Sequence, residues 1–177
     1  MNGTKRERED GSRITQKLDV SISEAATVDD YALGRTLFEE YATAIGVDLC
    51  FQNFSAELDR LSDMYGPPSG VLLIARIDAE TAGCVGLRRF RDDVCEMKRL
   101  YVRPSFRGRR LGRRLAEEVI RRARELKYGT LVLDTLSSMA AAYDLYLSMG
   151  FKPSPAYYPN PLPGVTYLAL DLRCSLE

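Results

Sequence analysis

The sequence predicts a single α/β (α+β) domain with a mixed, mostly antiparallel central sheet that is flanked by helices. Apolar and β-branched runs joined by very short turns predict an antiparallel meander over residues 71–102. A long amphipathic helix follows this meander, and the compact apolar strand after that helix is expected to pair in parallel. The expected order is β-α-α-β-β-β-α-β-α-β-β, and no internal repeat or linker divides the 177 residues.

Composition is that of an ordinary globular protein. Hydrophobic residues make up 45% of the chain, and 25 basic residues balance 25 acidic ones. No apolar run is long enough to cross a membrane, and the charged first residues lack the apolar core of a secretory signal, so we expect a cytoplasmic protein. Residues 1–16 lack apolar periodicity, which predicts a disordered tail before a domain at residues 17–177.

The elements before the meander follow from periodicity and capping. The alternation of apolar and polar side chains over residues 18–22 predicts the first strand. Thr27 or Asp29 is expected to cap a helix that Gly46 closes, and a second helix is expected over residues 54–64.

The meander begins after the turn formed by residues 66–70, which reads Gly-Pro-Pro-Ser-Gly. Its strands are expected at residues 71–77 and 84–90, and then from Val94 to Val102 before Pro104.

Helices and strands alternate in the second half of the chain. Apolar residues at helical spacing predict a helix from Leu111 to Lys127. After a strand at residues 130–134, Ser137 or Ser138 is expected to cap a further helix. The remaining elements are that helix to Met149, a loop-like, proline-rich segment from Phe151 to Pro163, and a last strand over residues 165–172.

Histidine is absent, and the four cysteines are scattered without a Cys-x-x-Cys motif. The absence of histidine excludes Ser–His and Cys–His nucleophilic sites and argues against most zinc sites, so no metal is expected. Acid–base chemistry must therefore come from Glu, Asp, Tyr, Lys or Cys side chains.

A basic, glycine-containing loop, Arg107-Gly108-Arg109-Arg110-Leu111-Gly112, joins the third meander strand to the long helix. A helix N-terminus has free N–H donors and the positive end of the helix dipole, and glycine lets an anion approach the backbone. This arrangement suits a phosphate, although glycines beside a helix also serve packing. The loop matches neither the dinucleotide-binding nor the P-loop pattern.

Two segments resemble motifs of the GNAT superfamily of N-acetyltransferases. Arg107-x-x-Arg110-x-Gly112 is similar to its [QR]-x-x-G-x-[GA] loop, with Arg110 in place of the middle glycine. Residues 142–151 resemble its A-x-x-L-Y-x-x-x-G-F segment, and Met139 stands where the family often has asparagine. The expected order of elements is also that of the family, from Leu18 to Leu172.

The resemblance implies acetyl-CoA as cosubstrate. Main-chain groups of the third meander strand are expected to pair with the pantetheine arm, and amides and arginines of the loop to hold the pyrophosphate. The cofactor-binding residues implied are Leu100, Tyr101, Val102, Arg107, Gly108, Arg109, Arg110, Leu111, Gly112 and Arg113.

The resemblance also implies two catalytic residues. A free amine is almost entirely protonated at neutral pH and must lose a proton before it attacks the thioester. Glu96 is the expected base; on an extended strand it shares a face with Lys98, Leu100 and Val102. Tyr146 is the expected acid for the leaving thiolate. The alternatives are a Glu96 paired with a neighbouring cation and a Tyr146 that only fills the core.

Arg88, Arg99 and Tyr158 are the candidate acceptor-binding residues, because an arginine in the cleft suits a carboxylate. They predict a small carboxylated amine such as an amino acid, although salt bridges with Glu39, Glu40 or Asp48 would equally occupy these arginines.

Two other functions stay open. One is a non-catalytic acetyl-CoA-binding regulator that docks a partner protein. The other is nucleic-acid binding through the basic helix, against which its interspersed glutamates argue. We expect no nucleic-acid or membrane partner and either a monomer or a homodimer.

Overall fold

The computed structural model describes residues 19–173, so the tail predicted at residues 1–16 lies outside the described residues. Seven strands form one sheet in the order β1-β2-β3-β4-β5-β7-β6. All neighbouring strands are antiparallel except β4 and β5, which confirms a mixed, mostly antiparallel sheet. The strands are β1 (Val20–Glu24), β2 (Val71–Ile77), β3 (Glu80–Arg91), β4 (Val94–Val102), β5 (Thr130–Leu136), β6 (Lys152–Pro153) and β7 (Val165–Asp171).

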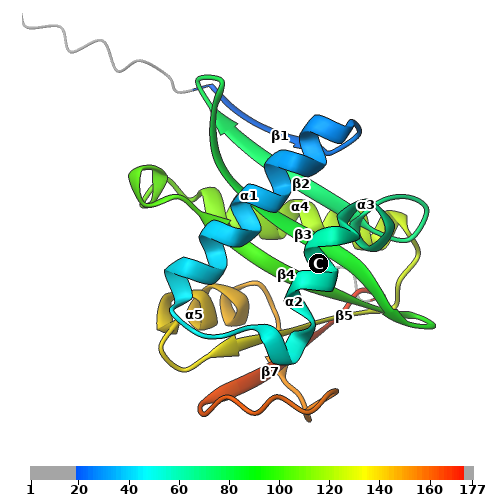
Figure 1. Cartoon of the computed structure of the whole chain (residues 1–177). Helices are drawn as coiled ribbons and strands as arrows, with labels where there is room; N and C mark the ends of the chain where they lie inside the picture. Colours follow the sequence, from blue (N-terminus) through cyan, green and yellow to red (C-terminus); the bar gives the residue numbers. More distant parts are fainter. Residues whose placement is uncertain (1–18, 174–177) are drawn as a thin grey trace, which may run out of the picture.

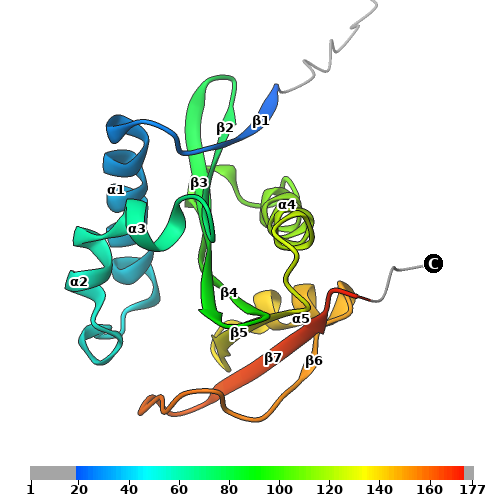
Figure 2. The same ribbon diagram turned by 90° about the vertical axis from the view of Figure 1, so that its right-hand side faces the viewer.

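Helices cover both faces of the sheet (Figures 1 and 2). On one face lie α1 (Val28–Ile45), α2 (Phe54–Asp59) and α3 (Leu61–Tyr65), and on the other lie α4 (Leu111–Glu125) and α5 (Ala140–Ser148). Each layer encloses an apolar core: Phe38 and Tyr65 are fully buried under α1 and α3, and Leu115 and Leu131 are fully buried under α4. Two short 3-10 helices, η1 (Cys50–Gln52) and η2 (Pro104–Phe106), complete the described elements.

The helix ends confirm part of the predicted capping. Thr27 caps α1 in a capping box with Asp30, and Gly46 ends it in the left-handed conformation with φ 66°. The helix predicted at residues 54–64 is instead two short helices that meet at Arg60. The cap predicted at Ser137 or Ser138 is also wrong, because the N-cap of α5 is Met139, which makes no side-chain capping bond.

A β-bulge interrupts β4. Gly86 faces Lys98 and Cys84 faces Tyr101, so β4 has one more residue than β3 in this interval. The extra residue turns at Arg99, whose φ is 58°. The bulge reverses the alternation of side chains: beyond it, Leu100 packs with the α4 core and Tyr101 with the α1 core. The prediction that Glu96 shares a face with Leu100 and Val102 is therefore wrong, because the strand is not continuously extended.

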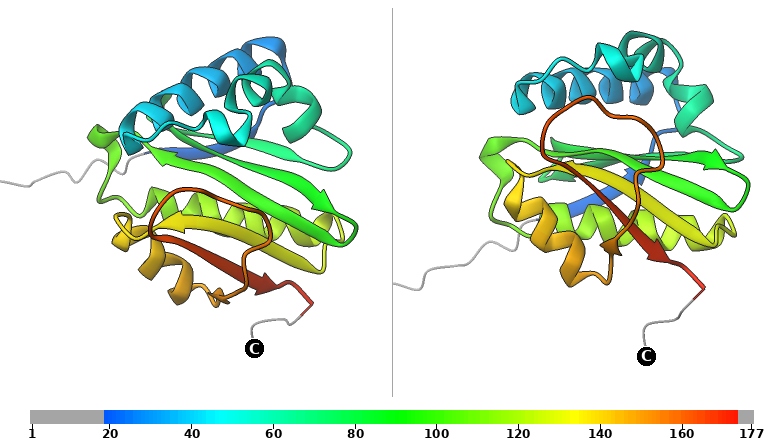
Figure 3. Two further views of the ribbon diagram at one scale, coloured as in Figure 1. Left: turned by 60° about the horizontal axis from the view of Figure 1, so that its bottom comes forward. Right: turned by 90° about the horizontal axis from the view of Figure 1, so that it is seen from below.

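β4 and β5 separate before the bulge. Their parallel pairing confirms the predicted pair, but it covers only Val94 to Glu96 on β4 and ends at Val132 on β5. Figure 3 shows the sheet edge-on between its two helical layers, with the loop between β6 and β7 arching toward the segment that joins α1 to α2. A hydrogen bond of 2.9 Å from Gln52 to the hydroxyl of Tyr158 connects the two.

The outer face of α4 is covered by ion pairs. Arg121 pairs with Glu118 and Glu125, and Arg122 pairs with Glu24 and Glu125. Such pairs are typical of a solvated helix face. Among the described residues, no helix is long and apolar enough to cross a membrane.

Candidate active site

A groove of about 930 Å³ runs along the separated edge of β4 and over the N-terminus of α4. It brings together every predicted cofactor-binding residue except Arg109, whose guanidinium instead lies 5.7 Å from the centre of the Phe106 ring. From the α5 side the groove is lined by residues 138–142 and Leu145. Both segments that resemble the family motifs therefore face one ligand-sized space.

The basic loop enters α4 without a side-chain cap. Its N-cap residue, Arg110, makes no capping bond, so the first N–H groups of α4 are not satisfied by a side chain. Arg110 has φ 58° and Gly108 has φ 79°, so both adopt the left-handed conformation that glycine tolerates best. A Cβ atom added at Gly112 would meet only Val102 and Leu145, at 3.9 and 4.0 Å, so packing within the chain does not require glycine there. These features suit a bound anion.

Two arginines of the loop region also bond to neighbouring elements. Nε of Arg107 donates to the carbonyl of Val102 at 3.1 Å, and Nη2 of Arg113 donates to Oγ of Ser148 at 2.6 Å. These bonds tie the loop to the end of β4 and α4 to α5, while both arginines still line the groove.

A smaller cavity of about 40 Å³ lies at the inner end of the groove, where β4 and β5 separate. We call it the inner cavity. Its polar and ionisable lining consists of Tyr41, Gln52, Lys98, Arg99, Asp134, Thr135, Tyr146 and Asn160. It shares Tyr41, Ile45, Leu100 and Met139 with the groove, so the two spaces adjoin. A long ligand in the groove would therefore end at a small polar chamber.

Tyr146 lies on α5 at the wall of this cavity and packs against Phe151, with 5.7 Å between ring centroids. Burial raises the pKa of the Tyr146 phenol well above its ordinary value. The phenol is therefore protonated at neutral pH and is a possible proton donor.

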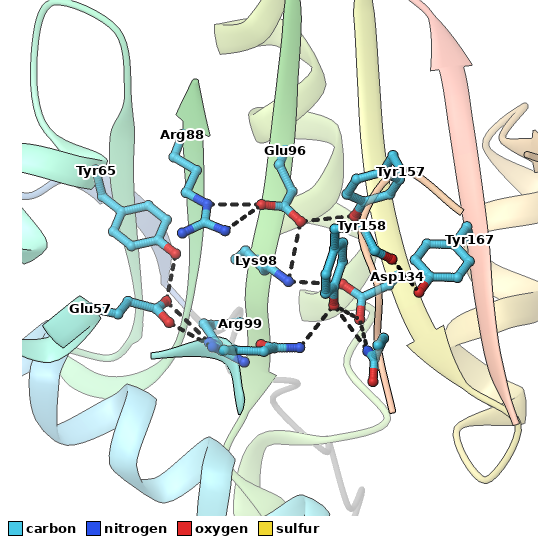
Figure 4. Close-up of polar contacts among 12 residues, drawn as sticks. Glu57, Tyr65, Arg88, Glu96, Lys98, Arg99, Asp134, Tyr157, Tyr158 and Tyr167 are labelled. Atoms are coloured by element: carbon cyan, nitrogen blue, oxygen red, sulfur yellow. Dashed lines mark hydrogen bonds and ion pairs between the residues drawn. The ribbon is translucent and has the colours of Figure 1, made fainter. Parts of the chain in front are cut away.

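Glu96 lies outside the cavity lining, in a buried polar cluster (Figure 4). One carboxylate oxygen accepts from Arg88 at 2.7 and 2.8 Å, and the other accepts from Tyr157 at 2.8 Å and lies 3.2 Å from Nζ of Lys98. Lys98 also donates to Asp134 at 2.9 Å. Glu96 therefore reaches the cavity through Lys98, and Arg88 lies behind Glu96 and does not line the cavity.

Arg99 lines the cavity and pairs with Glu57 of α2 rather than with Glu39, Glu40 or Asp48. Nε and Nη2 of Arg99 donate to the two oxygens of Glu57 at 3.2 and 2.6 Å, and both side chains are only 3% exposed. The hydroxyl of Tyr65 donates to the same carboxylate at 2.6 Å (Figure 4). A buried arginine is thus held rigidly at the cavity.

Asp134 is a cavity residue that the sequence reasoning did not select. It accepts from Lys98, from the hydroxyl of Tyr158 at 2.8 Å and from Asn160 at 3.2 Å. Burial alone would raise the pKa of Asp134, but Lys98 and Tyr158 outweigh it, so this carboxyl is ionised at neutral pH. One feature of the sequence could have pointed to Asp134 as a site residue, because it is a charged residue that directly follows the apolar run of residues 131–133.

Tyr158, a predicted acceptor-binding residue, supports the cavity from behind. Its hydroxyl bonds to Asp134, Gln52 and Asn160, and Nζ of Lys98 lies 5.0 Å from its ring centre. No local pattern marked Gln52, because its place in the site depends on this distant loop.

The groove has free helix N–H donors and an arginine-lined edge, and it adjoins a small chamber with a protonated phenol and ionised groups. This geometry is expected of an acyltransferase that uses a coenzyme A thioester. Residues 35–151, well over half of the chain, match the Acetyltransferase (GNAT) family. The chain belongs to this family and is an acetyl-CoA-dependent N-acetyltransferase.

Its relatives agree with this assignment. An uncharacterized N-acetyltransferase of Schizosaccharomyces pombe is 44% identical over 155 residues, which cover 86% of this chain and 95% of the relative. The N-acetylaspartate synthetase of Mus musculus is 33% identical over 101 residues, which cover 56% of this chain and 34% of that protein. A solved putative acetyltransferase from Salmonella typhimurium with its cofactor acetyl-CoA has a TM-score of 0.61 at 21% identity, covering 86% of this chain and 94% of that one.

Proposed function

We propose that this enzyme transfers the acetyl group of acetyl-CoA to the primary amine of a small carboxylated molecule, an amino acid or a close analogue, by direct attack in a ternary complex. The observation that carries the proposal is the presence of an arginine and a carboxylate, Arg99 and Asp134, in one small cavity beside the cofactor groove.

Arg99 suits the carboxylate of such an acceptor. Its bonds to Glu57 use Nε and Nη2, so Glu57 does not engage the Nη1 donors; Tyr41, which lines the same cavity, also interacts with the guanidinium. An amino acid has no net charge as a zwitterion, and the buried groups around the cavity are also balanced. The three cations are Arg88, Lys98 and Arg99, and the three carboxylates are Glu57, Glu96 and Asp134. The similarity to N-acetylaspartate synthetase adds aspartate to the acceptors to be tested.

The chemistry needs a neutral amine, a stabilised oxyanion and a protonated leaving thiolate. We assign removal of the amine proton to the connected carboxylates Glu96 and Asp134, with Glu96 as the predicted base, acting through Lys98. We assign protonation of the thiolate to Tyr146, whose raised pKa keeps its proton in place.

The function is tested by following CoA release from acetyl-CoA with the twenty amino acids, polyamines and simple amines. We expect one class of small carboxylated amines to release CoA, with initial-rate plots that intersect as a ternary complex requires. Parallel plots would indicate an acetylated enzyme instead. Tight acetyl-CoA binding with no release for any amine would overturn the proposal and favour a non-catalytic regulator.

The two assigned catalytic residues are tested by Tyr146→Phe and Glu96→Gln. Each is expected to lower kcat by about 10²-fold or more, since acid–base groups typically contribute 10²–10⁴-fold. Calorimetry should give an unchanged affinity for acetyl-CoA in both variants. A variant that retains the wild-type kcat shows that its residue has another role.

A further inference from the structure

We infer that Asp134 and Gln52 form the binding site for the amine of the acceptor and restrict the enzyme to primary amines. The inference rests on the proposed function, because it locates the reacting nitrogen of that same reaction. It concerns two residues that lie far apart in sequence, one on β5 and one on η1.

Accessibility separates Asp134 from the other carboxylate near the cavity. The side chain of Asp134 is 12% exposed and lines the cavity, whereas that of Glu96 is 1% exposed and does not. Lys98 occupies one position on Oδ1 of Asp134, while Tyr158 and Asn160 both bond to Oδ2. A carboxylate has about four acceptor positions, so one remains on Oδ1 for a ligand.

Gln52 supplies a second acceptor. Its Oε1 is buried and has no hydrogen-bond partner among the residues that the structure describes. The hydroxyl of Tyr158 fixes the direction of the amide, because this hydroxyl donates to Asp134 and so accepts from Nε2 of Gln52. The carbonyl end is therefore the free end. A buried acceptor without a donor is energetically unfavourable, and a donor brought by a ligand removes this cost.

Two free acceptors match the chemistry of the nucleophile. A neutral primary amine has two N–H donors and one lone pair. If Asp134 and Gln52 accept the two N–H groups, the lone pair is left to attack the thioester. A secondary amine has only one N–H and can satisfy only one of the two acceptors, and its further substituent would stand where the second N–H would point.

Kinetics of three variants test the inference, with the best acceptor from the amine panel as substrate. We expect Asp134→Asn to raise the acceptor KM by at least about tenfold, in line with a hydrogen bond to a charged group, and Gln52→Leu to raise it severalfold. The control is Asp63→Asn, the same change at an exposed carboxylate on α3, which should leave KM unchanged. Acetyl-CoA affinity should match the wild type in all three.

The N-methyl derivative of the same acceptor supplies a comparison without mutation. We expect its kcat/KM to fall by at least about a hundredfold, because one hydrogen bond is lost and the cavity must hold an extra methyl group. Comparable turnover of the two acceptors would overturn the restriction to primary amines. An unchanged KM in Asp134→Asn would overturn the amine site itself, and if that variant does not fold, an unchanged KM in Gln52→Leu does so.

Binding of methylammonium, detected by NMR saturation transfer, distinguishes this inference from the proposed function. We expect binding to the wild type and to Asp63→Asn, and its loss in Asp134→Asn. If this pattern holds while no amine releases CoA, the amine site stands and the proposed function fails. If CoA is released but neither methylammonium binding nor KM depends on Asp134, the function stands and the inference fails.

Discussion

Backbone conformation, as well as charge, bears on the choice of residue at single positions of the basic loop at residues 107–112. Arg110 stands where the family pattern has glycine, and its φ of 58° is the conformation that favours glycine. Gly112 is the opposite case, because a Cβ atom there would meet only ordinary contacts. The chain thus tolerates strain at Arg110, where a side chain can add positive charge, and keeps Gly112 small where it lines the groove.

Gly112→Asp is expected to weaken acetyl-CoA binding by an order of magnitude or more. The new carboxylate would stand at the start of α4, beside the expected pyrophosphate, and repel it. Titration calorimetry measures the effect. Gly112→Ala is the matched control: its methyl group fits, so its affinity should stay close to that of the wild type. An unchanged affinity in the Asp variant would remove this loop from the ligand site.

Arg110→Gly is expected to increase the free energy of unfolding by about 1 kcal/mol, because glycine adopts the left-handed conformation without strain. Urea denaturation measures the change. Arg109→Gly is the control; Arg109 is not among the residues with positive φ, so glycine there should destabilise. Equal effects of the two substitutions would show that backbone strain at Arg110 is not significant.

At the scale of elements, the bulge in β4 and the anchoring of α2 position the site. The pairing of β4 with β5 ends at Glu96, before the bulge, and Arg99 within the bulge lies on the cavity wall. The Arg99–Glu57 pair then fastens α2 to the sheet, and the rings of Phe54 and Tyr41 lie 5.1 and 5.7 Å from the guanidinium. The short helix α2 therefore depends on a tertiary ion pair.

Glu57→Gln is expected to cost about 3–5 kcal/mol of unfolding free energy, because it leaves Arg99 buried without a compensating charge. Chemical denaturation measures the loss. The control is Glu39→Gln, which breaks the exposed Arg35–Glu39 pair and should cost no more than about 0.5 kcal/mol. Similar costs for both substitutions would contradict a structural role for the buried pair.

The same pair predicts a dependence on pH. Burial by itself would raise the pKa of Glu57, but the Arg99 guanidinium and the Tyr65 hydroxyl outweigh it and hold that pKa below its usual value of 4.5. A carboxyl whose pKa is lower in the folded than in the unfolded protein stabilises the fold fully at pH values above its unfolded-state pKa. This stabilisation is lost as the pH falls through the folded-state pKa. The difference in stability between wild type and Glu57→Gln should therefore shrink below about pH 4.5. A difference that stays constant down to pH 2 would show that the ionisation of Glu57 does not stabilise the fold.

At the scale of the whole molecule, the sheet consists of β1 to β4 on one side and β5, β7 and β6 on the other, and only three residue pairs join β4 to β5. The pairing of β4 with β5 ends at Glu96, and the groove follows the rest of this edge. A ligand that pairs with the edge of β4 would link the halves as an added strand does. Cofactor binding is thus expected to stabilise the centre of the molecule.

Acetyl-CoA is expected to slow amide hydrogen exchange in residues 100–102, 107–108 and 110–112, which line the groove, and to leave β2 unchanged. At a ligand concentration of one hundred times Kd, global stability should rise by about 2.7 kcal/mol. Hydrogen-exchange mass spectrometry with and without acetyl-CoA provides the measurement. Protection confined to other segments would place the ligand elsewhere.

Local sequence patterns predicted much of the fold and most of the residues that line the groove. Strand alternation, helical periodicity and capping residues predicted the element order, the parallel pair and the Thr27 cap, because each depends on neighbours in sequence. The strand and loop predicted to bind the cofactor line one groove, apart from Arg109, because both segments are continuous.

Only the tertiary structure brought together the residues of the inner cavity. The partner of Arg99 is Glu57, 42 residues away, and Gln52 bonds to Tyr158 across 106 residues. The bulge at Arg99, which reversed the predicted faces of β4, depends on the register with β3. The sequence by itself therefore determined the family and the segments that line the groove, since both follow from contiguous motifs. The structure decided which carboxylate lines the cavity, because buried ion pairs form between elements that local patterns do not connect.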